Sequence, residues 1–98
     1  ISAKVRREIH MKITLDIKEF KDRKKAHLYL KKILNLPDYY GENLDALYDC
    51  LGEVVEKTVI EIPRGIQDKA YLGEYGKTML QVFRDAAVEN EALQIRIK

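Results

Sequence analysis

The sequence predicts a small α/β domain in which a three-stranded parallel sheet packs with about four helices. Three short segments have the apolar or alternating pattern of strands, and apolar residues at helical spacing fill the intervals between them. Helices that join successive strands imply parallel pairing with right-handed crossovers. A chain of 98 residues is long enough for one core and too short for two, so we expect one domain.

The three predicted strands are short. Apolar and polar residues alternate over residues 11–18, which predicts a strand with one buried face. Residues 58–62 form a second predicted strand, which ends at Pro63 because proline cannot donate a hydrogen bond to a neighbouring strand. Residues 93–97 alternate again and predict the third strand.

Four helices are predicted between the strands. The first is capped by Asp22 and ends before Pro37, since a residue that precedes proline avoids the helical conformation. A second helix is expected over residues 43–51, because its first residue is asparagine, a favoured N-cap. Residues 65–72 are a candidate short helix, and the apolar spacing over residues 75–89 predicts a longer amphipathic helix.

The first ten residues differ from the rest of the chain. They have no clear amphipathic pattern, and Met11 resembles a natural start, so we interpret residues 1–10 as an N-terminal extension and residues 11–98 as the domain. The charged residues of the extension, Lys4, Arg6, Arg7 and Glu8, account for the whole net charge of +2. The basic isoelectric point is therefore no indication of nucleic-acid binding.

Cysteine content and hydropathy indicate a cytoplasmic protein. The only cysteine, Cys50, cannot form an internal disulfide, whereas small secreted domains usually contain several. No apolar stretch approaches the roughly 20 residues that span a bilayer, and the chain does not begin with the apolar run of a signal peptide. We expect no membrane contact.

Charge is unevenly distributed along the chain. Residues 18–32 contain seven basic and two acidic side chains, a balance typical of the solvated face of a helix. Residues 36–56 contain no lysine or arginine and six acidic residues: Asp38, Glu42, Asp45, Asp49, Glu53 and Glu56. The acidic block is the less usual feature.

Two of these carboxylates share one face of the second predicted helix. Asp45 and Asp49 are four residues apart, a spacing at which like charges destabilise a helix by about 0.2–0.5 kcal/mol. A repulsion that no nearby basic residue in the sequence relieves indicates a functional surface. The alternative is an acidic face that only confers solubility. Tyr39 and Tyr48 accompany the carboxylates, and such mixtures suit a binding site for a cationic partner. We expect Tyr40 to pack in the core.

The sequence of residues 36–51, Leu-Pro-Asp-Tyr-Tyr-Gly-Glu-Asn-Leu-Asp-Ala-Leu-Tyr-Asp-Cys-Leu, closely resembles the signature of the barstar family, bacterial inhibitors of barnase-type ribonucleases. Residues 80–86 also resemble the long C-terminal helix of that family. The predicted order of strands and helices agrees with the family over residues 11–98.

The resemblance implies an inhibitor whose loop and short helix enter the active site of a ribonuclease, with a carboxylate in place of an RNA phosphate. That carboxylate would be Asp49, and Asp45 would flank it. Tyr48 stands where the family has tryptophan, and Gly52-Glu53-Val54 replaces threonine-glycine-tryptophan, which bears on the identity of the ribonuclease. The partner-binding residues are expected to be Tyr39, Asn43, Asp45, Tyr48, Asp49, Gly52, Glu53 and, on another helix, Asp85, where the family has glutamate.

Other functions are less well supported by the sequence. An enzyme would need its carboxylate pKa values pushed apart, which carboxylates on one exposed helix do not favour. Metal ligation is not expected, because one cysteine and scattered carboxylates match no tight ligand spacing, and no cofactor is expected either. Cys50 is interpreted as a packing residue and His27, in the lysine-rich helix, as exposed.

The partner is therefore expected to be a ribonuclease with a basic active site. A nuclease must concentrate positive charge to bind phosphate, so an acidic surface is complementary to it, whereas the same surface would repel RNA itself. We expect a monomer in the absence of the partner. The rival interpretation is a barstar-like binding module or immunity protein whose partner is not a ribonuclease.

Overall fold

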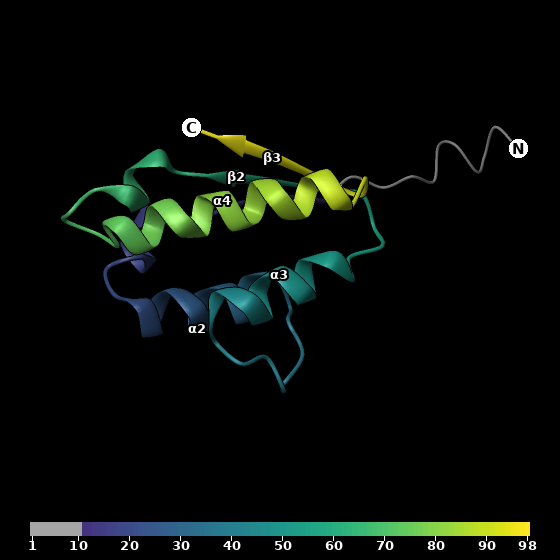
Figure 1. Cartoon of the computed structure of the whole chain (residues 1–98), viewed down its shortest axis with the longest axis horizontal. Helices are drawn as coiled ribbons and strands as arrows, with labels where there is room; N and C mark the ends of the chain where they lie inside the picture. Colours follow the sequence, from purple (N-terminus) through teal and green to yellow (C-terminus); the bar gives the residue numbers. More distant parts are fainter. Residues whose placement is uncertain (1–10) are drawn as a thin grey trace, which may run out of the picture.

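The computed structural model describes residues 11–98, whose three strands form one parallel sheet in the order β1-β2-β3 (Figure 1). The strands are β1 (Met11–Thr14), β2 (Thr58–Ile62) and β3 (Leu93–Ile97). β1 is shorter than predicted, because the chain leaves the sheet after Thr14 and forms the 3-10 helix η1 (Ile17–Glu19). The predicted N-terminal extension lies outside the described residues.

Three α-helices are present within residues 11–98: α2 (Arg23–Ile33), α3 (Leu44–Gly52) and α4 (Glu74–Glu89). Both predicted N-caps are confirmed. The side chain of Asp22 accepts a hydrogen bond from the backbone N–H of Lys25 at 2.8 Å, and Asn43 accepts one from Ala46 at 2.8 Å. These bonds satisfy backbone donors that the first helical turn leaves without partners.

The candidate short helix over residues 65–72 is not an α-helix. The chain instead forms the short 3-10 helix η2 (Arg64–Gln67), which begins one residue before the predicted segment. At its end the Asp68 N–H donates to the Gly65 carbonyl at 2.9 Å. Turns then lead to α4. Such tighter helices have poorer hydrogen-bond geometry and rarely extend beyond one turn.

The α-helices lie on one side of the sheet, as Figure 1 shows for the layer below the strands. Each helix contributes buried side chains to the core, among them Leu30 of α2, Leu47 of α3 and Phe83 of α4. Ile60 and Ile62 of the central strand join the same core. All five residues of β2 are buried, because this strand has a neighbour on each side.

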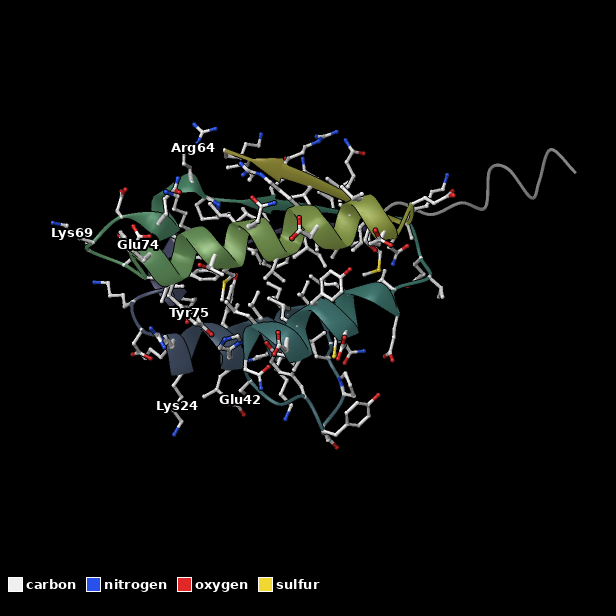
Figure 2. The ribbon with its side chains drawn as sticks, viewed as in Figure 1. Lys24, Glu42, Arg64, Lys69, Glu74 and Tyr75 are labelled. Carbon is white, nitrogen blue, oxygen red and sulfur yellow. The ribbon has the colours of Figure 1, made fainter. Side chains whose placement is uncertain are left out.

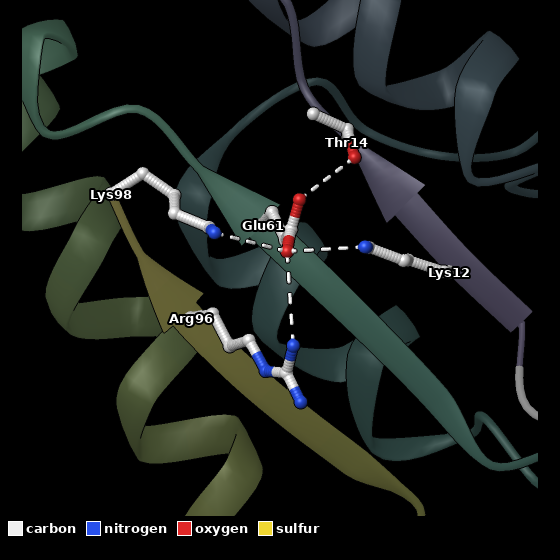
Figure 3. Close-up of polar contacts among 5 residues, drawn as sticks. All are labelled: Lys12, Thr14, Glu61, Arg96 and Lys98. Carbon is white, nitrogen blue, oxygen red and sulfur yellow. Dashed lines mark hydrogen bonds and ion pairs between the residues drawn. The ribbon is translucent and has the colours of Figure 1, made fainter.

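The opposite face of the sheet is held by a charged cluster around Glu61 (Figure 3). The Thr14 hydroxyl donates to Glu61 Oε1 at 3.0 Å, while Oε2 lies 3.4–3.8 Å from the cationic groups of Lys98, Lys12 and Arg96. The hydrogen bond from Thr14 is the main cause of a lowered Glu61 pKa; burial opposes it, and the lysines add to it. One carboxylate therefore connects all three strands.

α4 packs very closely against η2 at Gly76. A Cβ atom at this position would overlap the backbone carbonyl of Ile66, so only glycine permits the approach. The contact fixes the start of α4 relative to the end of β2, and thereby the position of the residues in its first turn.

Replacing Gly76 with alanine is expected to destabilise the protein by about 1–3 kcal/mol, because overpacking outweighs the gain in helix propensity of about 1 kcal/mol. Urea unfolding measures the difference. Gly52→Ala is the control, since no neighbouring atom lies within 4 Å of a Cβ atom there. A Gly76→Ala variant as stable as the parent would contradict the close approach.

Candidate functional site

α3 buries one face and exposes the other. Leu47, Cys50 and Leu51 are buried against the core. The residues on the opposite face, spaced three and four apart, are exposed: Asp45, Tyr48, Asp49 and Gly52. The structure thus places four of the predicted partner-binding residues on one continuous strip.

The two carboxylates of this strip have no cationic partner within residues 11–98: no basic side chain there forms an ion pair with Asp45 or Asp49. Asp45 lies in the first turn, where the helix dipole favours negative charge, but Asp49 lies beyond it. Asp49 is therefore a carboxylate without local compensation, available to a cation from outside the molecule.

The loop before α3 presents one tyrosine outward and one inward. Tyr39 is 77% exposed, whereas Tyr40 is buried, which confirms the prediction that Tyr40 packs in the core. A turn brings the Tyr40 N–H to the Pro37 carbonyl at 2.9 Å, and Glu42 adopts a positive φ of 55°, which is uncommon for residues other than glycine. Asn43 then caps the helix and donates to the Gly41 carbonyl at 3.2 Å.

His27 is buried, so the prediction that it is exposed was wrong. Its ring nitrogens both have hydroxyl partners: Nδ1 lies 2.5 Å from the Tyr40 hydroxyl and Nε2 lies 2.6 Å from the Tyr75 hydroxyl. These bonds make burial of a polar ring possible. His27 shares the inward face of α2 with Leu30, three residues on, and that spacing is the signal in the sequence that could have revealed it.

Burial also sets the protonation of this cluster. It lowers the pKa of His27, with the negative charge of Glu42 opposing the shift, so the imidazole is neutral at pH 7. A neutral ring donates through one nitrogen and accepts through the other. Burial likewise raises the pKa of Tyr40 and Tyr75, so both phenols remain protonated and can donate.

The C-terminal end of α3 is held by Asn90, at the end of α4. Its Nδ2 donates to the carbonyl oxygens of Leu51 at 3.0 Å and Val54 at 2.9 Å, and its Oδ1 accepts from the Ala92 N–H at 2.9 Å. Sequence reasoning missed this residue, because an asparagine after a helix is a common C-terminal residue and its partners lie 36–39 positions earlier.

The remaining predicted partner-binding residues lie at the C-terminal end of α3 and on α4. Gly52 ends α3, and Glu53 caps it in an exposed position. Asp85 lies on the exposed side of α4, where its carboxylate accepts from Gln81 Nε2 at 2.9 Å. No hydrogen bond or ion pair within residues 11–98 joins Asp85 to the exposed strip of α3.

An open groove of about 520 Å³ borders the start of α3. It lies between the first turns of α2 and α4 and the loop before α3, as the positions of Lys24, Glu42 and Tyr75 in Figure 2 show. Its lining also includes His27 and Asp45. The buried histidine is therefore adjacent to the predicted binding surface.

The similarity of the sequence to known proteins identifies its family. The sequence model of a family described as "Barstar (barnase inhibitor)" matches residues 10–98. The chain belongs to the barstar family. One relative, from Bacillus subtilis (strain 168), is named "Putative ribonuclease inhibitor YrdF" and is 37% identical over 79 residues, which cover 80% of this chain and 87% of the relative. The family resemblance of the sequence is thereby confirmed.

Residues 11–98 contain no group of three or more histidine, cysteine, aspartate or glutamate side chains placed to hold a metal ion. None of their helices combines the length and apolar character needed to cross a bilayer. Cys50 is buried, as predicted, and burial, with Glu53 and Asp49 nearby, raises the pKa of its thiol.

The lowered pKa of His27 makes stability depend on pH. The unfolded chain binds a proton below about pH 6.5 that the folded protein does not, so the free energy of unfolding should fall as the pH drops from 7.5 to 5.5. Urea unfolding across this range measures the effect. A His27→Gln variant should be less stable at pH 7.5 but should vary less with pH, and a parent protein with constant stability would contradict a neutral buried ring.

Proposed function

We propose that this protein inhibits a barnase-type ribonuclease by covering the active site of the enzyme with the exposed strip of α3 and the preceding loop. The observation that carries the proposal is the pair of carboxylates without an ion-pair partner in residues 11–98, Asp45 and Asp49, beside two exposed tyrosines. A ribonuclease concentrates positive charge to bind phosphate, so this surface is complementary to it. Membership of the barstar family supports the choice of partner.

In the proposed complex Asp49 takes the place of an RNA phosphate. Asp45 pairs with a second basic group, and the rigid rings of Tyr39 and Tyr48 exclude water around these charges. Asn43 contacts the enzyme at the start of the helix. Gly52 and Glu53 border the contact at the other end of α3, and Asp85 reaches its rim.

Several properties follow from this proposal. The protein acts as a monomer that binds one ribonuclease in the cytoplasm, where an uninhibited enzyme would degrade cellular RNA. It carries out no reaction and uses no cofactor, and it does not bind RNA, because its acidic surface repels the phosphate backbone. Tyr48 and the Gly52-Glu53-Val54 segment contribute to the choice among ribonucleases.

Replacing Asp49 with alanine is expected to weaken inhibition by at least about a hundredfold, because the variant leaves a basic group of the enzyme buried without its partner. The fold should be unchanged, since the side chain is exposed. The measurement is a titration of each variant into a barnase-type ribonuclease while RNA cleavage is followed.

Asp68→Ala, which removes an exposed carboxylate beside η2, is the matched control and should inhibit like the parent. If Asp49→Ala inhibits as well as the parent, the role assigned to Asp49 is wrong. If the parent does not inhibit at all, the partner belongs to another class of protein.

Association with the ribonuclease should be fast at low salt and about tenfold slower or more at high salt, because mobile ions screen the attraction that steers the two proteins together. Stopped-flow measurements across a salt series give the association rate. The dissociation rate should change much less. Association that does not depend on salt would indicate an apolar interface elsewhere on the molecule.

A further inference from the structure

Three elements that are distant in sequence meet at the ring of His27. The ring belongs to α2, Tyr40 comes from the loop before α3, and Tyr75 comes from the first turn of α4. Tyr40 lies 13 residues from His27 and Tyr75 lies 48 residues from it. The cluster therefore connects the proposed binding loop to α2 and to the first turn of α4.

The loop has few other attachments to the core. Tyr40 is its buried side chain, and the Lys31 ammonium reaches the Asp38 carbonyl only at 3.5 Å. The positive φ of Glu42 is a conformation that surrounding contacts must maintain. Because Tyr39 directly precedes Tyr40, a fixed Tyr40 side chain also fixes the backbone from which the exposed Tyr39 ring projects.

Tyr75 binds one nitrogen of the His27 ring, while the other nitrogen binds Tyr40 of the loop. The two bonds are coupled through the neutral ring, which donates through one nitrogen and accepts through the other: when the Tyr75 hydroxyl donates to Nε2, Nδ1 donates to the Tyr40 oxygen, and in the other tautomer Nε2 donates to Tyr75 and Nδ1 accepts from Tyr40. Tyr75 is itself held in place, because the Arg23 guanidinium lies 4.1 Å from the centre of its ring. The close contact of Gly76 with η2 fixes the backbone beside it.

We propose that Tyr75 is a positioning residue for the binding loop: through His27 and Tyr40, its hydroxyl holds residues 39–43 in the conformation that the partner meets. The proposal rests on the function proposed above for this surface. Its energetic basis is preorganisation, since a loop that is already ordered loses less conformational freedom on binding. Tyr75 is a half-buried side chain and need not touch the partner.

The test compares Tyr75→Phe with Tyr29→Phe in the full chain. Each variant removes one hydroxyl with a hydrogen-bonded partner, but the Tyr29 hydroxyl accepts from the Asp16 N–H at 3.0 Å, away from the loop. Two properties are measured: the backbone order parameters of residues 39–43 in the free protein, and the affinity for a barnase-type ribonuclease.

Tyr75→Phe should lower the order parameters of the loop and weaken binding about threefold to tenfold, whereas Tyr29→Phe should change neither property. Tyr40→Phe removes the other hydroxyl of the cluster and should have a similar effect. Since both hydroxyls act through one ring, the double variant should lose much less than the product of the two single losses. A purely structural role of Tyr75 would not produce this pattern.

The outcomes separate the two proposals. If the parent binds and Tyr75→Phe matches Tyr29→Phe in both measurements, the positioning role is overturned while inhibition stands. If the parent does not bind a ribonuclease, the proposed function fails. The order parameters of residues 39–43 then test the positioning role of Tyr75 by themselves. A loop that loses order in Tyr75→Phe then supports positioning, and an unchanged loop overturns it.

Discussion

The structure depends on the requirement that a three-stranded parallel sheet in sequential order be covered from one side. Both connections, from β1 to β2 and from β2 to β3, are crossovers of the same hand, so they place their helices on the same face. The core forms only there. Within residues 11–98 no helix covers the other face of the sheet (Figure 1). There the Glu61 carboxylate of the central strand pairs with charged side chains from both outer strands.

One-sided coverage also explains the position of the acidic surface. α3 belongs to the first crossover and must bury Leu47 and Leu51 against the core, which leaves its carboxylates directed outward. The helix packs against α4, and Asn90 binds its C-terminal end. Because the helix is held at these contacts, Asp45 and Asp49 stay close together despite their mutual repulsion.

Prediction from the sequence succeeded where the signal is local. Alternation located β3, and asparagine at an N-cap located the start of α3. The prediction that His27 is exposed failed because its hydrogen-bond partners are distant in sequence. His27 lies in a lysine-rich segment, and the two hydroxyls that bind its ring belong to residues 13 and 48 positions away. Spacing alone correctly placed Asp45 and Asp49 on one exposed face of α3, whereas the roles of these residues and of Asp85 in binding stay predictions.

The side-chain hydrogen bonds of Asn90 have a consequence for engineering the chain. The residue connects the end of α3, the segment that follows it and the turn into β3, so β3 cannot be treated as a dispensable edge strand. Shortening the C-terminus as far as Asn90 would release one end of α3 as well as one side of the sheet. An appended reporter is a gentler modification, since Lys98 is exposed and follows the last strand.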